Sequence, residues 1–354
     1  MNSVLRVGIV GAGGYTGAEL VRLIHAHPRL ELVWVAAAKT AGQRLGEVLP
    51  SLIGLEPYAS MVLDAFEPAK AADVAAKVDV AFLALPHATS ATVGAALLAA
   101  GVRVVDLSAD FRLREAAVYE AAYGKHPHPE LLSQAVYGLP ELHRPELNGA
   151  RLIAAPGCYP TSAILPLAPL LKAGLVESSG IIIDSKSGVS GAGKSPSAAT
   201  HFSECSEGLI AYKIAGTHRH VPEIEQELSL AAGTSVKVVF TPHLTPMTCG
   251  IHTTAYARLK PGTTAEVARE AARNLYGRGL VTVLPEGKLP DTLWVRGSCR
   301  AMLAYAVDDH TDTLIALSVI DNLARGASAQ AVQALNVALG WAEDLGLPVI
   351  ATFP

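Results

Sequence analysis

The 354-residue chain is half apolar and only 17% charged, which excludes a disordered protein and allows two domains with full hydrophobic cores. Its formal net charge is −4 without a basic cluster, so neither nucleic acid nor an anionic membrane surface is expected as a partner. No apolar run reaches the roughly 18 residues of a membrane span, and we expect no signal peptide. The four cysteines form no disulfide or metal-ligand pattern, so we expect a cytoplasmic, reduced protein without a metal site.

A glycine-rich turn near the N-terminus predicts a dinucleotide site. Residues 5–10 predict a buried strand, residues 18–24 have helical spacing, and the glycine turn lies between them. In such a unit, glycines let the backbone approach a pyrophosphate, which the helix N-terminus attracts. Thr16 occupies the third glycine position of the strict fingerprint, so a purely structural turn is the alternative. The predicted contacts are Gly11, Gly13, Gly14, Tyr15, Thr16 and Gly17.

The end of the second predicted strand indicates the type of nicotinamide cofactor. Residues 31–37 predict this strand, and an NAD-specific domain usually ends it with an acid that holds the ribose 2′-hydroxyl. Here Ala38, Lys39 and Thr40 follow, without a carboxylate. A lysine and a hydroxyl suit a 2′-phosphate better, so we predict NADP; alternatively, Lys39 is an ordinary solvated side chain.

Alternating strands and helical segments predict a doubly wound parallel sheet, in which ligands bind at the carboxyl ends of the strands. The further strands are residues 78–85 and 102–107, separated by an alanine-rich helical run that ends at Ala100. Pro86 and His87 follow one strand end, and Arg112 follows the other as a candidate anion contact. The alternatives are a simple loop histidine and an ion pair of Arg112 with Asp106 or Asp110.

A cysteine directly after a strand is the candidate nucleophile. The apolar run 152–155 predicts the strand, Pro156-Gly157 ends it, and Pro160 fits the first turn of a following helix. At such a helix N-terminus, unpaired N–H groups and the helix dipole favour a thiolate at Cys158. The alternative is a small buried hydrophobe.

The second half of the chain predicts a different domain, with a mainly antiparallel sheet and helices on one face. Its β-rich segments are residues 181–184, 236–240, 251–259, 301–307 and 313–320. A Ser/Gly loop, residues 185–194, offers backbone donors for a phosphate or a nicotinamide, or is only a flexible surface loop. A last helix within 327–339 is expected to return to the first domain.

Two further segments carry predictions about local structure. Pro166 and Pro169 predict that any helix after Cys158 is kinked or broken. Residues 119–148 show no clear periodicity, so we expect a long excursion there.

A short polar segment supplies candidate acid–base groups. His218, His220 and Glu223 lie within six residues. Histidine is the natural acid or base near neutral pH, and a carboxylate can fix its tautomer, whereas a metal site needs more ligands than lie nearby. A polar helix start with solvated charges is the alternative.

A nicotinamide domain combined with an activated cysteine and a histidine indicates reduction of an acyl phosphate through a thioester. Several segments, in the same order, resemble those of the N-acetyl-gamma-glutamyl-phosphate reductase family, whose fold resembles glyceraldehyde-3-phosphate dehydrogenase. These segments are residues 11–20, 106–112, 157–161, 187–193, 218–224 and 321–322. The resemblance implies NADPH-dependent reduction of N-acetyl-L-glutamyl 5-phosphate to the 5-semialdehyde in arginine synthesis, by a homo-oligomer (dimer or tetramer).

The family pattern also implies roles for single residues. Cys158 is the nucleophile, and His218 is the first choice for acid or base, with His220 second and Glu223 orienting either. Nicotinamide and substrate contacts of the family fall on residues 188–193 and Asn322. Together with the strand-end candidate, the predicted substrate contacts are Arg112, Ser187, Ser190, Gly191 and Lys194. Two departures from the family are Gly13 in place of a common serine and Lys194 in place of a frequent arginine.

We therefore expect an NADP-binding Rossmann domain at residues 1–155, completed by a C-terminal helix within 322–354, and a catalytic and dimerisation domain at residues 156–321. The nearest alternative function is the related aminoadipyl-phosphate reductase of lysine synthesis, which has Asn-Ala where this chain has Tyr159-Pro160. Further alternatives are an aspartate-semialdehyde dehydrogenase, a thiol hydrolase using Cys158 and His218, and a nucleotide-sensing protein without catalysis.

Overall fold

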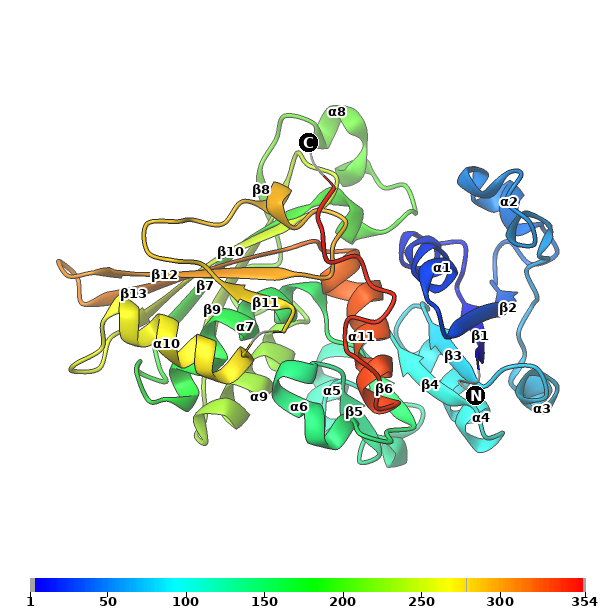
Figure 1. The fold of residues 1–354 in the computed structure, drawn as a ribbon, viewed down its shortest axis with the longest axis horizontal. Helices are drawn as coiled ribbons and strands as arrows, with labels where there is room; N and C mark the ends of the chain where they lie inside the picture. The colour runs from blue at the N-terminus through cyan, green and yellow to red at the C-terminus, as the bar shows by residue number, and fades with distance from the viewer. Residues whose placement is uncertain (1–3, 278, 353–354) are drawn as a thin grey trace. The chain divides into compact units, whose positions relative to one another are not determined.

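The computed structural model describes residues 4–277 and 279–352, and the chain forms two compact units (Figure 1). The first unit comprises Met1–Pro156 and Ala327–Leu347, and the second comprises Gly157–Gly326 and Pro348–Pro354. Residues 322–326 and 348–354 thus belong to the second unit, while the segment with the last helix belongs to the first.

The first unit is built on a six-stranded, fully parallel sheet with the order β2-β1-β3-β4-β6-β5. The strands are β1 (Leu5–Val10), β2 (Leu30–Ala36), β3 (Val80–Leu83), β4 (Arg103–Asp106), β5 (Ala135–Tyr137) and β6 (Leu152–Ala154). Its helices are α1 (Tyr15–Ala26), α2 (Leu45–Val48), α3 (Ala71–Ala75), α4 (Thr89–Ala99), α5 (Ala116–Tyr123), α6 (Pro140–Leu147) and α11 (Ala329–Ala338). This arrangement confirms the predicted doubly wound parallel sheet.

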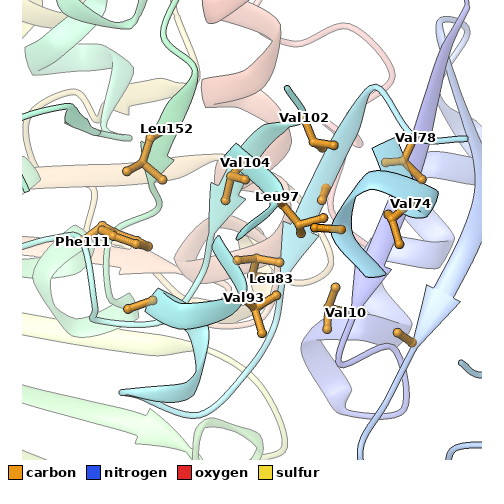
Figure 2. Packing of buried hydrophobic residues seen from close by; sticks show 14 of the residues in the cluster. Val10, Val74, Val78, Leu83, Val93, Leu97, Val102, Val104, Phe111 and Leu152 are labelled. Atoms are coloured by element: carbon orange, nitrogen blue, oxygen red, sulfur yellow. The ribbon is translucent and has the colours of Figure 1, made fainter. Parts of the chain in front are cut away.

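Both faces of this sheet are buried, as parallel sheets require. On one face, the cluster in Figure 2 packs Val74 of α3 and Leu97 of α4 against strand residues such as Leu83 and Val104. Neighbouring strand residues point to the opposite face; Phe82 and Val105, for example, are fully buried there. Helices α1 and α11 contact each other and the sheet.

The predicted long excursion at residues 119–148 is wrong, because this stretch contains regular structure. It holds most of α5, strand β5 at the sheet edge beside β6, and α6. These elements have 8, 3 and 8 residues, which is too short to display a helical or strand period in the sequence.

The second unit contains a seven-stranded mixed sheet with the order β11-β12-β13-β10-β7-β9-β8. Four of its six strand pairs are antiparallel and two are parallel, so the prediction of a mainly antiparallel sheet is confirmed. The strands are β7 (Ile181–Gly188), β8 (Ile210–Ala211), β9 (Val238–Thr245), β10 (Ile251–Arg258), β11 (Val281–Val283), β12 (Ala301–Asp308) and β13 (Thr313–Ile320). The helices are α7 (Cys158–Lys172), α8 (Phe202–Cys205), α9 (Val221–Ala232) and α10 (Ala265–Tyr276), of which α7, α9 and α10 gather on one side of the sheet (Figure 1).

Helix α7 is one continuous helix, so a break at its prolines is wrong, while the alternative of a kink stays a prediction. Pro166 and Pro169 cannot donate to the carbonyls of Ser162 and Leu165 four residues earlier. Side-chain hydroxyls replace those donors, since Ser318 Oγ donates to the Ser162 carbonyl and Tyr276 Oη donates to the Leu165 carbonyl at 2.6 Å. Residues 159–171 are all buried, so packing along the whole helix adds to its stability.

Among the described residues, no helix combines the length and the apolar character needed to cross a membrane.

Candidate active site

In the glycine turn after β1, two of the glycines have no room for a side chain, whereas a third does. Gly11 has a φ of +92°, and an added Cβ there would lie 2.2 Å from the Ala84 carbonyl oxygen. A Cβ at Gly17 would lie 2.5 Å from the Gly11 carbonyl oxygen, so close backbone approach requires glycine at both positions. Gly14 is the N-cap of α1, and an added Cβ there would meet nothing closer than 3.8 Å.

This turn fits the phosphates of a dinucleotide. The first turn of α1 contains no acidic side chain, so the positive end of its dipole is not neutralised by a carboxylate within that turn. The turn also lies at the topological switch point, because β1 is placed between β2 and β3.

Other predicted cofactor residues lie at the carboxyl edge of the same sheet. Lys39 is exposed in the turn after β2, and Pro86 and His87 are exposed after β3. His87 Nδ1 accepts the Ala109 N–H at 3.1 Å, which connects the loops after β3 and β4. The structure thus brings these residues to one edge of the first unit.

Arg112 is buried in the loop after β4, with only 6% of its surface exposed. Its Nε donates to the Ala155 carbonyl and its Nη2 to the Leu107 carbonyl, both at 2.8 Å. These bonds tie the loop after β4 to the residue that follows β6. A substrate contact of Arg112 stays a prediction.

In the second unit, Cys158 is the first residue of α7, and its N-cap Gly157 has no side chain. The Gly157 N–H donates to Glu223 Oε1 at 2.8 Å, and Glu223 in the first turn of α9 is 2% exposed. On another side, Gly326 packs against the nucleophile, since an added Cβ there would lie 2.7 Å from the Cys158 Cβ. Gly326 was not predicted, because no local sequence signal indicates its contact with the distant Cys158.

The two histidines lie together in a cluster of aromatic rings just before α9. Their ring centroids are 4.9 Å apart, and the Tyr159 ring lies 5.6 Å from His218 and 6.1 Å from His220. The His220 N–H donates to His218 Nδ1 at 3.1 Å. Burial, together with the nearby charges of Lys213 and Arg219, lowers the pKa of His218 to about 4, so this ring is neutral at pH 7.

Two tyrosine hydroxyls adjoin this cluster. Tyr212 Oη donates to Tyr159 Oη at 3.2 Å, and Tyr159 Oη donates to the His243 carbonyl at 3.1 Å. Burial raises the pKa of Tyr159, and it raises the pKa of Tyr212 to about 12; a negative charge on Cys158 contributes to both shifts. Both hydroxyls therefore remain protonated donors. No motif in the sequence indicates Tyr212.

The predicted Ser/Gly loop is partly wrong, because its first four residues, 185–188, continue strand β7 between β9 and β10. Burial alternates along β7, as expected for a strand, and Ser185 and Ser187 lie at almost fully buried positions. Residues 189–192 form a 3₁₀ turn, and Gly191 and Lys194 are exposed.

Asn322 connects this turn with a second loop. Its Oδ1 accepts the Gly250 N–H at 2.7 Å, and its Nδ2 donates to Ser190 Oγ at 2.9 Å. Gly188 also contacts that loop, because an added Cβ would lie 2.6 Å from the Thr248 carbonyl oxygen. Gly188 and Asn322 thus have structural roles in this region. Their predicted cofactor contacts stay predictions.

Cys158, His218, His220 and Glu223 belong to the second unit, as do Ser187, Gly188, Ser190, Gly191, Lys194 and Asn322. The glycine turn, Lys39, Pro86, His87 and Arg112 belong to the first. Within the described residues, no group of three or more His, Cys, Asp or Glu side chains is arranged to hold a metal ion.

Comparison with known families defines the class of protein. Residues 6–150 match the model of the semialdehyde dehydrogenase NAD binding domain, and residues 158–322 match that of the semialdehyde dehydrogenase dimerisation domain. The chain is thus an oxidoreductase of the semialdehyde dehydrogenase class with a nicotinamide-binding domain. Proteins of Pelobacter propionicus and Geobacter sulfurreducens, both named N-acetyl-gamma-glutamyl-phosphate reductase, are each 48% identical over 352 residues, covering 99% of this chain and 100% of theirs. The chain belongs to the N-acetyl-gamma-glutamyl-phosphate reductase family.

Solved structures share the fold at much lower sequence identity. An aspartate semialdehyde dehydrogenase II of Vibrio cholerae superimposes with a TM-score of 0.71 at 16% identity, covering 95% of this chain and 98% of that one. The aspartate semialdehyde dehydrogenase of Candida albicans gives a TM-score of 0.66 at 15% identity, with 95% and 100% covered.

Proposed function

We propose that this protein reduces N-acetyl-L-glutamyl 5-phosphate with NADPH to N-acetyl-L-glutamate 5-semialdehyde and phosphate, a step of arginine synthesis. The observation that carries the proposal is Cys158 at the first position of α7, in a chain whose full-length relatives are named for this reduction. A helix N-terminus favours the thiolate, and a thiolate is the nucleophile that an acyl phosphate requires.

The proposed reaction begins at the Cys158 sulfur. The thiolate attacks the acyl carbon, the phosphate leaves with the bonding electron pair, and a thioester remains on Cys158. NADPH, when bound, supplies the hydride that reduces this thioester. Hydride addition leaves an alkoxide at the former acyl carbon, and an acid–base group donates a proton to it to give the thiohemiacetal. The same group takes this proton back as the C–S bond breaks, which releases the aldehyde and the Cys158 thiolate.

We assign the proton transfers to the His218 and His220 pair, with His218 first. Because His218 Nδ1 accepts the His220 N–H, the proton of the neutral ring is on Nε2, where it can stabilise an oxygen that gains charge during attack. His220 is the second candidate. Separate His218→Asn and His220→Asn variants distinguish them, because the acid–base residue should lose more in kcat than in KM.

The proposed cofactor is NADP, because exposed Lys39 follows β2 where an NAD-specific domain has an acid. The proposed cofactor contacts are Gly11, Gly13, Gly14, Tyr15, Thr16, Gly17, Lys39, Pro86, His87, Gly188 and Asn322. The proposed substrate contacts are Arg112, Ser187, Ser190, Gly191 and Lys194. We assign cofactor binding to residues 1–155 with the C-terminal helix, and catalysis to residues 156–321.

We also propose a homo-oligomer that forms through the second unit. Val239, Ile182 and Tyr256 are cross-strand neighbours on β9, β7 and β10, and they are 56%, 45% and 38% exposed. Such an exposed apolar row, in a region that matches a dimerisation domain, suits a second copy of the chain. The four cysteines all lie in the described part of the chain and form no disulfide there, which supports a reducing, cytoplasmic location.

The decisive experiment supplies the purified protein with NADPH and one acyl phosphate at a time, and follows the loss of NADPH absorbance. We expect turnover with N-acetylglutamyl phosphate, weaker turnover with NADH, and no reduction by Cys158→Ser, which should still bind NADPH. Turnover of only the aminoadipyl or the aspartyl compound would overturn the assignment. Thiol-dependent hydrolysis without nucleotide would favour a hydrolase instead.

A further inference from the structure

Glu223 is a buried carboxylate that contacts the backbone directly before the nucleophile. Its Oε1 accepts the N–H of Gly157 at 2.8 Å, and only 2% of the residue is exposed. Burying a carboxylate is costly unless hydrogen bonds and favourable dipoles surround it. Glu223 has both, because it lies in the first turn of α9 and beside the first turn of α7, so two positive helix ends face it.

The N-terminus of α7 has no cap of its own. Its N-cap Gly157 has no side chain, and no side-chain cap hydrogen bond is formed there. In a capping box, the third helical residue is a Glu or Gln that accepts the N-cap N–H, but in α7 this position is Pro160. Glu223 supplies the missing acceptor from another helix. The conformation of the peptide that leads into Cys158 therefore depends on α9.

We propose that Glu223 is a positioning residue. Its side chain is long enough to accept the Gly157 N–H, and this hydrogen bond, rather than the negative charge, fixes the position of the Cys158 sulfur. The inference rests on the proposed function only in taking Cys158 as the reacting group. It differs from a role in orienting a histidine, in which the Glu223 side chain would hydrogen-bond an imidazole ring instead of the Gly157 N–H.

Three substitutions separate the effect of side-chain length from the effect of charge. Glu223→Gln keeps the length and an acceptor oxygen but loses the charge. Glu223→Asp keeps the charge but is shorter by one methylene, and Glu223→Ala loses both. For each folded variant, the readouts are the rate of iodoacetamide alkylation of Cys158, followed by mass spectrometry, and kcat and KM for N-acetylglutamyl phosphate.

The proposal predicts that Glu223→Gln stays within about threefold of the wild type in alkylation rate and kcat. Glu223→Asp and Glu223→Ala should fall about tenfold to a hundredfold in kcat with little change in KM, because a small displacement of a reacting atom has effects of this size. Their alkylation rates should also move away from the wild-type value. A Glu223→Gln variant as impaired as Glu223→Ala, beside an active Glu223→Asp variant, would overturn the proposal in favour of charge.

Glu225→Ala is a matched control on the same helix. Glu225 accepts the Val238 N–H at 3.2 Å, so its removal also deletes a carboxylate-to-backbone hydrogen bond of α9. We expect lower thermal stability but wild-type alkylation of Cys158; an equal change in alkylation would contradict a specific role for Glu223. Alkylation needs neither substrate nor NADPH, so it tests the positioning role even if the proposed reduction fails.

Discussion

Asp106 is a fully buried carboxyl at the end of β4, where Ser90 and Ser108 donate hydrogen bonds to it. Burial raises its pKa to about 6 despite these bonds. In the unfolded chain the pKa is about 3.9. Between pH values of about 3.9 and about 6, the Asp106 carboxyl keeps its proton in the folded protein but has released it in the unfolded chain. The free energy of unfolding therefore falls as pH rises through this range, by about 3 kcal/mol in total.

Asp106→Asn should remove this contribution. Urea unfolding of wild type and variant at pH 4 and at pH 6.5 measures it, because other titrating groups cancel in the difference between the proteins. We expect the variant to gain stability relative to the wild type as pH rises from 4 to 6.5. A difference that is the same at both pH values would show that Asp106 titrates normally.

At the level of residues, the sequence indicates chemistry better than packing. Cys158 is recognisable because a strand end, a glycine and an early proline surround it in sequence. Gly326 contacts the same cysteine from a distant part of the chain, and only the fold reveals that contact. Glu223 was predicted to orient a histidine, whereas its bond to Gly157 depends on how α7 and α9 pack.

Helix α7 shows how tertiary contacts overrule a local rule. Pro169 leaves the Leu165 carbonyl without its helical donor, and Tyr276 Oη donates to that carbonyl instead. Tyr276→Phe should therefore destabilise the protein by about 1–3 kcal/mol, the penalty for a buried acceptor without a partner. Denaturant unfolding monitored by circular dichroism measures this loss.

Pro169→Ala provides the matching control, since it restores the backbone N–H opposite the Leu165 carbonyl. In the Pro169→Ala background, Tyr276→Phe should cost less than in the wild type, and the difference is the coupling energy of a double-mutant cycle. Equal costs in both backgrounds would mean that the hydroxyl does not substitute for the missing helical bond.

Several of the strands were predicted well from the sequence. Strands β1 and β13 have the predicted bounds, β10 and β12 differ by one residue at one end, and β2 differs by one residue at each end. The errors include β5, which has three residues, the serines at the end of β7, residues 241–245 of β9, and the helix α10, which was not predicted. Serine and glycine favour loops by propensity, but here their hydrogen bonds to β9 and β10 hold them in the strand conformation.

At the scale of the whole molecule, the second unit exposes an apolar row where an isolated sheet would favour polar residues. Helices α7 and α10 contact strands of this sheet, and alternate residues such as Ile183 are fully buried, whereas Ile182 between its neighbours Val239 and Tyr256 is exposed. Under the proposed homo-oligomer, a second copy covers this row.

Ile182→Lys places a charge in the middle of that row and should weaken the oligomer. Burying an unpaired ammonium is strongly unfavourable, whereas an exposed lysine on a monomer costs little. Light scattering after size-exclusion chromatography should give a smaller mass for the variant than for the wild type at equal concentration. Leu230→Lys is the control, because Leu230 on α9 is similarly exposed, at 48%, but lies outside the sheet. An unchanged mass for Ile182→Lys, or the same loss with Leu230→Lys, would mean that copies of the chain associate through another surface.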